Sequence, residues 1–276
     1  MSKLYWSFFS IDYYNKLQTL DGFEVTIRAN LNASTDYKNA VRHGAKGIGL
    51  YRSEYLFNSD GDFPTEDEQF AIYNKIADVA GIHGVRIRTF DLTTSAVTHT
   101  EKNPALGLRG IRLAMNMEET FRRQICAILR ASFEKRVDII LPMISDISEI
   151  RWAKKIISEE KEHLESKGIK FGNPNLGSMI EVPAAVLIID EIFEECDFVS
   201  LGTNDLVQYL LAMGRDSENV ADWSRTLHPA VLKSLKIVLT ASKQHKKNAT
   251  ICGEMASSMF CIPIFLAYGA TDLSMN

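Results

Sequence analysis

The sequence predicts a single α/β domain, a (β/α)8 TIM barrel, and three observations support this fold class. Short apolar, β-branched segments alternate with longer amphipathic segments along the chain, a pattern typical of parallel strands joined by crossover helices. Eight such strand segments occur, which fits a closed barrel better than the alternative, an open doubly wound sheet. The length of 276 residues agrees with the roughly 250 residues of one such barrel.

The expected strands are short, apolar and rich in β-branched residues. In chain order they span Phe23–Ala29, Gly47–Tyr51, Val85–Phe90, Val137–Leu141, Gly177–Glu181, Phe198–Gly202, Ala249–Gly253 and Thr271–Met275. Amphipathic stretches between them are expected to form the crossover helices. These stretches are Thr35–His43, Thr65–Ala80, Met117–Phe133, Ile147–Lys167, Ala184–Phe193 and Pro229–Gln244.

The expected barrel takes residues 21–276, and a leader segment takes residues 1–20. This leader is rich in aromatic residues, so we expect it to pack along the surface or to dock as a helix. The chain ends at Asn276, directly after the eighth expected strand. The last helix of a complete barrel would then be lacking, through truncation or an unusual closure, and a partner or the leader would cover the groove.

The composition excludes several classes of protein. Apolar residues make up 46% and charged residues 24%, which is ordinary for a soluble globular domain. A net charge of −4 and a pI near 5.9 argue against nucleic-acid binding. The four cysteines form no CxxC pair, which predicts neither a metal knuckle nor a disulfide framework. No apolar stretch or signal peptide predicts membrane insertion or export, so we expect a cytoplasmic protein.

Arginines and carboxylates follow the expected strands at their carboxyl ends, where barrels carry their functional groups. The segments concerned are Gly49–Glu54, Arg88–Asp91, Asn103–Arg112, Met179–Pro183, Gly202–Asp205 and Cys252–Glu254, and Arg215 lies on the segment after the sixth strand. Because parallel strands of one barrel end at the same mouth, we expect these side chains to converge.

Glu181 and Asp205, on neighbouring strands, would repel each other unless a cation or a proton intervened. Mg²⁺ takes carboxylate oxygens together with substrate oxygens and waters. Guanidinium groups bind carboxylates and phosphates through paired hydrogen bonds. The site therefore predicts a small polyanion bound through a metal, and phosphorylated carboxylates fit that description.

Each of these residues also has a structural interpretation, such as a rim ion pair for an arginine or a small buried apolar group for Cys252. Their joint occurrence at five strand ends favours a site. Arg42, Arg86, Arg225 and the six histidines keep the structural interpretation. His228 precedes Pro229 and is expected to begin a helix.

Several motifs resemble those of enzyme I of the bacterial sugar phosphotransferase system, a member of the phosphoenolpyruvate (PEP)-utilising enzymes. They are Gly44–Phe57, Arg88–Asp91, Asn103–Arg112, Glu181–Ala185, Leu201–Tyr209 and Cys252–Ala256. The resemblance runs from about Thr19 to Met275. Pyruvate phosphate dikinase and PEP synthase share the Gly-Thr-Asn-Asp-Leu and Cys-Gly-Glu motifs, so the resemblance identifies the superfamily more sharply than the subfamily.

The resemblance implies a PEP/pyruvate-type barrel and a role for each matching residue. Arg52, Arg88 and Arg215 would hold PEP, Asn204 and Asp205 would lie at its phosphate, Arg109 would support the departing phosphate, Glu181 and Asp205 would ligate Mg²⁺, and Cys252 would protonate C3 of the pyruvate enolate. The phosphoryl group would pass to a histidine on a separate domain. A small phosphocarrier protein and a second copy of the barrel are the implied protein partners.

The sequence departs from this family in three places. It lacks the phosphohistidine domain and the domain that docks the phosphocarrier protein. After Asp91 it has Leu92-Thr93-Thr94-Ser95-Ala96, where enzyme I has Gly-Gly-Asp-Lys nearby. It also stops before the usual final helix.

Three functions therefore remain open at the level of sequence. The first is PEP-dependent phosphotransfer with an acceptor on another domain or chain, of the enzyme I type or of the related dikinase and synthase type. The second is a regulatory module that binds PEP without turnover. The third is a Mg²⁺-dependent barrel enzyme of the citrate-lyase or aldolase kind.

Overall fold

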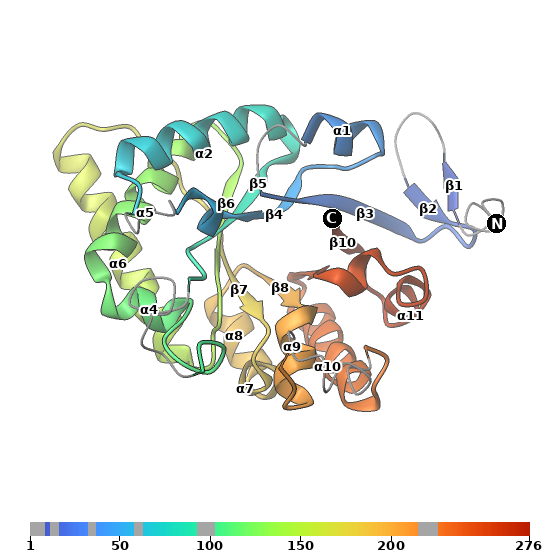
Figure 1. The fold of residues 1–276 in the computed structure, drawn as a ribbon. Coiled ribbons are helices and arrows are strands. Elements are labelled where there is room, and N and C mark those ends of the chain that lie inside the picture. The colour runs from blue at the N-terminus through green and yellow to red at the C-terminus, as the bar shows by residue number, and fades with distance from the viewer. Residues whose placement is uncertain (1–8, 12–16, 33–36, 58–62, 93–102, 215–225) are drawn as a thin grey trace.

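The computed structural model describes residues 9–11, 17–32, 37–57, 63–92, 103–214 and 226–276. Eight parallel strands close into a barrel with helices on its outside (Figure 1). These strands are β3 (Glu24–Leu31), β4 (Ile48–Arg52), β5 (Val85–Arg88), β6 (Val137–Leu141), β7 (Leu176–Ile180), β8 (Phe198–Gly202), β9 (Asn248–Cys252) and β10 (Asp272–Met275). The barrel closes because β3 pairs with both β4 and β10. The predicted fold class is confirmed.

Two further strands lie at the amino-terminal side of β3. β1 (Phe9–Ile11) pairs antiparallel with β2 (Leu17–Thr19), which in turn pairs antiparallel with β3. These described stretches of the expected leader segment are extended rather than helical. They project beyond the barrel in Figure 1.

The helices follow the strands in the order that a barrel requires. They are α1 (Tyr37–Arg42), η3 (Ser53–Leu56), α2 (Glu66–Ala80), η4 (Gly81–His83), α4 (Ile111–Asn116), α5 (Glu118–Ala131), α6 (Ile147–Ser166), α7 (Pro183–Leu187), α8 (Ile189–Glu195), α9 (Thr203–Leu210), α10 (Pro229–His245), η6 (Glu254–Ser257) and α11 (Ile262–Ala267). The single helix expected over Ala184–Phe193 divides at Ile188, which has non-helical backbone angles. The short helices α4, α9 and α11 were not predicted.

Side-chain caps explain where three of the long helices begin. Thr65 and Glu68 form a capping box at the start of α2, and Asp146 and Glu149 form another at the start of α6. At α10 the Nδ1 atom of His228 accepts a hydrogen bond of 3.1 Å from the backbone N–H of Ala230. The structure thus shows His228 as the cap of a helix, as its position before Pro229 suggested.

The core has two layers, because successive strand side chains point to opposite faces. Outward-facing residues such as Ile87, Ile139 and Val199 belong to the large cluster that the helices cover. Inward-facing residues form a separate small cluster, namely Leu50, Ile140, Met179, Phe198 and Cys252. This inner cluster fills the barrel beneath its carboxyl-terminal mouth.

An ion network occupies the amino-terminal end of the barrel. Arg28 Nε lies 2.9 Å from Asp272 Oδ2, and Arg86 NH2 donates to Asn248 Oδ1 at 3.1 Å. The Arg86 guanidinium also lies 4.3 Å from the centre of the Phe198 ring. Arg86 therefore has a structural role, while Arg42 is exposed on the last turn of α1 and Arg225 lies outside the described residues.

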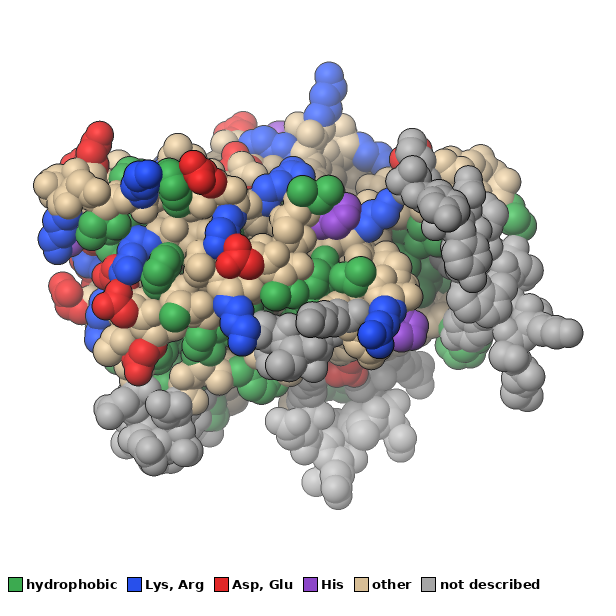
Figure 2. Space-filling model, turned by 90° about the horizontal axis from the view of Figure 1, so that it is seen from above, with side chains coloured by type: hydrophobic (Ala, Val, Ile, Leu, Met, Phe, Trp, Pro, Cys, Tyr) green, Lys and Arg blue, Asp and Glu red, His purple; other side chains and the backbone are tan. Residues whose placement is uncertain are grey.

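Charges of both signs are mixed on the face seen from above Figure 1 (Figure 2). On the described residues of this face, basic side chains are spread across the view and most acidic ones lie toward its left side. Within the described ranges, no helix has both the length and the apolar character needed to cross a bilayer.

A substitution at Gly177 tests how tightly the inside of the barrel is packed. A Cβ atom at this position would lie 2.4 Å from the Phe198 ring, so we expect Gly177→Ala to lower the free energy of unfolding by about 1–3 kcal/mol. Denaturant unfolding of Gly177→Ala, Phe198→Leu and the double variant measures the effect. The cost of Gly177→Ala should shrink in the Phe198→Leu background. An equal cost in both backgrounds would contradict the proposed overlap.

Candidate functional site

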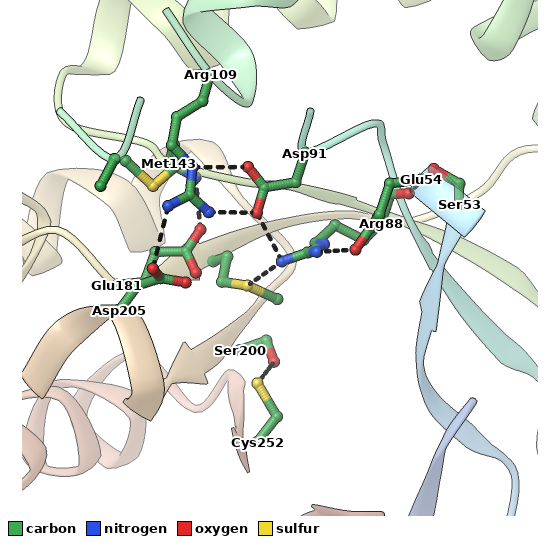
Figure 3. A network of polar contacts seen from close by, with 12 residues as sticks. Ser53, Glu54, Arg88, Asp91, Arg109, Met143, Glu181, Ser200, Asp205 and Cys252 are labelled. Carbon is green, nitrogen blue, oxygen red and sulfur yellow. Dashed lines mark hydrogen bonds and ion pairs between the residues drawn. The ribbon is translucent and has the colours of Figure 1, made fainter. Parts of the chain in front are cut away.

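A cavity of about 810 Å³ opens at the carboxyl-terminal end of the barrel. Arginines, carboxylates and one cysteine from different strand ends face it (Figure 3). It brings together every described residue that the sequence assigned to a site, namely Arg52, Arg88, Arg109, Glu181, Asn204, Asp205 and Cys252. Arg215 lies outside the described residues.

Arg88 ends β5 and lies between two carboxylates. Its NH1 atom is 3.0 Å from Asp91 Oδ2, and its NH2 atom donates to Glu54. Its Nε atom is buried without a hydrogen-bond partner. Burial by itself would lower the pKa of Arg88, but Glu54 and Asp91 outweigh burial and raise it. The guanidinium is therefore charged, and its Nε donor is unused.

Arg109 shares the carboxylate of Asp91 with Arg88. Arg109 Nε and NH2 donate to the two Asp91 oxygens at 3.1 and 2.8 Å, and its NH1 donates to Asp205 Oδ1 at 3.1 Å. Burial would raise the pKa of Asp91, but Arg88 and Arg109 hold it below its usual value. An alternating chain of charges therefore runs from Glu54 to Asp205 across the mouth (Figure 3).

The turn after Arg109 depends on a glycine. Gly110 has φ +54°, and a Cβ atom there would lie 2.8 Å from the Cβ atom of Met143. Only glycine combines this backbone conformation with so close an approach. The turn brings the loop that carries Arg109 against the end of β6.

Glu181 follows β7 and is almost completely buried, with 1% of its surface exposed. The backbone N–H of Met143, a residue with φ 60°, donates to Glu181 Oε1 at 2.7 Å. Burial, and then the charges of Asp91 and Asp205, raise the pKa of Glu181 to about 8. A buried carboxyl group beside two other carboxylates is stabilised either by binding a proton or by a cation next to it.

Asn204 and Asp205 lie in the first turn of α9, directly after β8. Asn204 Oδ1 accepts a hydrogen bond of 3.0 Å from the backbone N–H of Glu254. Gly253 permits this contact, because a Cβ atom there would lie 2.3 Å from Thr203 Oγ1. The loops after β8 and β9 are thus fixed to each other at the cavity.

Cys252 ends β9 and forms part of the cavity wall. Its Sγ atom lies 3.1 Å from the carbonyl oxygen of Leu201, and Ser200 Oγ donates to it at 3.3 Å. Burial raises the pKa of this thiol to about 11. It is therefore protonated at neutral pH and has a proton that it could donate.

Two carboxylates of the cavity fit a divalent cation. Mg²⁺ is usually held by one or two carboxylates together with substrate phosphates and waters rather than by a full protein cage. Glu181 and Asp205 provide such a pair, and burial, together with the charges of Asp91 and Asp205, raises the pKa of Glu181. Within the described ranges, no group of three or more His, Cys, Asp or Glu residues forms a metal cage by itself.

Four residues of the site had no role assigned from the sequence, namely Glu54, Asp91, Met143 and Tyr209, although Glu54 and Asp91 lie in segments that were expected at the mouth. Glu54 and Asp91 lie in the motifs that contain Arg52 and Arg88. A carboxylate so close in sequence to an arginine of the site could have indicated that the two form an ion pair. Tyr209 accepts a hydrogen bond of 3.1 Å from Arg109 NH1. Met143 contributes its backbone N–H, for which its residue type gives no signal.

Comparison with known proteins shows the family of this chain. Residues 11–276 match the family described as PEP-utilising enzyme, PEP-binding domain. The phosphoenolpyruvate-protein phosphotransferase of Bacillus sp. (strain S) is 40% identical over 264 residues, which cover 94% of this chain and 46% of that protein. The protein of the same name from Staphylococcus aureus is 39% identical over the same shares. The chain thus spans about half the length of these relatives.

A solved structure shares the fold at low sequence identity. The HpcH/HpaI aldolase from Desulfitobacterium hafniense DCB-2 superposes with a TM-score of 0.51 at 16% identity, covering 91% of this chain and 85% of that one. This likeness supports the barrel architecture alone. The family match, in contrast, extends over almost the whole sequence and every described residue of the cavity. The chain therefore belongs to the PEP-utilising enzymes and corresponds to their PEP-binding domain.

Proposed function

We propose that this barrel binds PEP together with Mg²⁺ and transfers its phosphoryl group to a histidine on another domain or chain, releasing pyruvate. The observation that carries the proposal is the composition of one cavity. Arg52, Arg88 and Arg109 line it together with the carboxylates of Glu181 and Asp205. Such a cavity suits a small ligand that carries both a phosphate and a carboxylate and that brings a cation with it.

The arginines would bind and orient the anionic ligand. Arg88 has an unused Nε donor, and the Asp91 carboxylate holds Arg88 and Arg109 side by side. Arg52 donates to Asn32 Oδ1 at 3.2 Å at the edge of the cavity. Arg215, which the sequence assigns to the same task, would add a fourth guanidinium. Positive groups placed in advance stabilise the charge that develops as the phosphoryl group departs.

Glu181 and Asp205 would hold the Mg²⁺ ion. When bound, the ion would act as a Lewis acid that stabilises negative charge on the oxygens of the ligand. Asn204 is held at the cavity by the Glu254 N–H and would lie beside the phosphate. The phosphoryl group would move to a histidine nitrogen as the bond between phosphorus and the enol oxygen breaks.

Cys252 would complete the reaction. Departure of the phosphoryl group leaves the enolate of pyruvate, whose C3 atom needs a proton. The thiol of Cys252 has the proton at neutral pH, because burial raises its pKa to about 11. It would transfer this proton from Sγ to C3 and regain another from solvent after pyruvate leaves.

The acceptor and partners form part of the same proposal. The relatives named phosphoenolpyruvate-protein phosphotransferase are about twice as long as this chain, which supports an acceptor histidine outside the barrel. A small phosphocarrier protein would receive the group next, as the first step of sugar phosphotransfer, and a homodimer would form through the barrel. Cys126, Cys196, Cys252 and Cys261 are unpaired and buried, which supports a reducing, cytoplasmic location.

Calorimetric titration of PEP with and without Mg²⁺ tests the binding step. Wild type should show saturable binding that depends on Mg²⁺, and Asp205→Ala should lose it because one carboxylate ligand is removed. Asp190→Ala, which removes an exposed carboxylate on α8, is the matched control and should bind as wild type does. Absence of binding to folded wild type would overturn the proposed function.

Proton exchange at C3 of pyruvate tests the role of Cys252 without needing an acceptor. In D₂O with Mg²⁺, wild type should incorporate deuterium into the pyruvate methyl group, followed by NMR. Cys252→Ala should slow this incorporation roughly a hundredfold or more, because a general acid–base group contributes at least that much. Cys261→Ala, another buried cysteine, should leave the rate unchanged. Equal rates in wild type and Cys252→Ala would assign the proton to another group.

A further inference from the structure

A glutamine outside the cavity is connected to the backbone on both sides of Thr89, the residue that directly follows Arg88 of the cavity. Gln124 lies on α5 and is fully buried. Its Oε1 atom accepts a hydrogen bond of 3.0 Å from the backbone N–H of Phe90. Its Nε2 atom donates to Ser53 Oγ at 2.9 Å and to Tyr73 OH at 3.0 Å. All donors and acceptors of this amide but one lone pair are used inside the protein.

The direction of every hydrogen bond in this network is determined. The Phe90 N–H can only donate, so it fixes which end of the Gln124 amide is the oxygen. Both hydrogens of Nε2 are then used on hydroxyl groups, and each hydroxyl must donate onward. Ser53 Oγ donates to the carbonyl oxygen of Arg88 at 2.6 Å, and Tyr73 OH donates to Gln69 Oε1 at 3.1 Å.

The network therefore fixes the backbone at the end of β5. The Arg88 carbonyl is held through Ser53 and the Phe90 N–H is held directly, one on each side of Thr89. Ser53 itself directly follows Arg52, the last residue of β4. The backbone beside Arg52 and Arg88 is thus held by hydrogen bonds to a single amide on the outer helix α5, through Ser53 and Phe90. Figure 3 shows Ser53 beside Arg88 and Glu54.

We infer that Gln124 is a positioning residue, which sets the places of Arg52 and Arg88 for the ligand of the cavity. This inference rests on the proposed function for the identity of that ligand. A displacement of about 1 Å in a binding group can cost a hundredfold in rate. A network with one permitted hydrogen-bond direction prevents such a displacement, because any shift of the two strand ends leaves buried donors unpaired.

Three variants separate positioning from simple support of the fold. Gln124→Met removes all three hydrogen bonds, and Ser53→Ala removes the connection to the Arg88 carbonyl. Tyr73→Phe removes one hydrogen bond of the same amide but leaves both connections to β5, and it keeps the ring that packs against Tyr51. Thermal unfolding gives the stability of each variant, and titration of PEP with Mg²⁺ well below every melting temperature gives the affinity.

All three variants should be less stable than wild type. Gln124→Met and Ser53→Ala should also bind PEP roughly tenfold more weakly or worse, whereas Tyr73→Phe should retain wild-type affinity. Equal affinity in all folded variants would overturn the inference. If wild type binds no PEP, the proposed function falls, and crystal structures of the same variants decide the inference. A displaced Arg88 in Gln124→Met but not in Tyr73→Phe would support it, and an unmoved Arg88 in both would refute it.

Discussion

The buried carboxylate of Asp91 is the group around which the cavity is arranged. Its Oδ2 atom lies 3.0 Å from Arg88 NH1 and 2.8 Å from Arg109 NH2. Two guanidinium groups this close would repel each other in a partly dry site, and an isolated carboxylate would be costly to bury. Each charge is stable there because of the others. Arg88 and Arg109 come from different segments, so this triad joins the end of β5 to the loop before α4.

Carboxyl groups that share one cavity have pKa values shifted in opposite directions because their surroundings differ. Arg88 and Arg109 overcome the effect of burial and keep the pKa of Asp91 low. For Glu54 and Glu181 burial prevails and raises the pKa, to about 8 at Glu181. Environment thus separates a permanently charged support from a group that a proton or a cation can neutralise. This division agrees with the proposed function, in which Asp91 would order the arginines and Glu181 would hold the cation.

The two ends of the barrel differ in how their arginines are paired. At the amino-terminal end, Arg28 and Arg86 both pair with Asp272, and Arg86 also donates to Asn248. At the carboxyl-terminal end, Arg52, Arg88 and Arg109 line an open cavity, and Arg88 keeps an unused Nε donor. Gln124 shows that the chemical end is also supported from outside, since a helix on the barrel's surface fixes the backbone that carries Arg88. Barrels commonly divide their two ends in this way.

The sequence alone predicted all eight barrel strands to within two residues, as well as the mouth to which the arginines and carboxylates converge. The strands could be predicted because short apolar segments alternate with amphipathic ones along the chain. The mouth could be predicted because the carboxyl ends of parallel strands lie at the same end of a barrel. It did not predict the break between α7 and α8, the pairing of Asp91 with Arg88 and Arg109, or the contacts of Gln124. A glutamine in a helical pattern looks the same whether it faces solvent or a strand end. Only the tertiary structure decides whether Gln124 faces solvent or a strand end, because closure of the barrel brings together residues that are far apart in the chain.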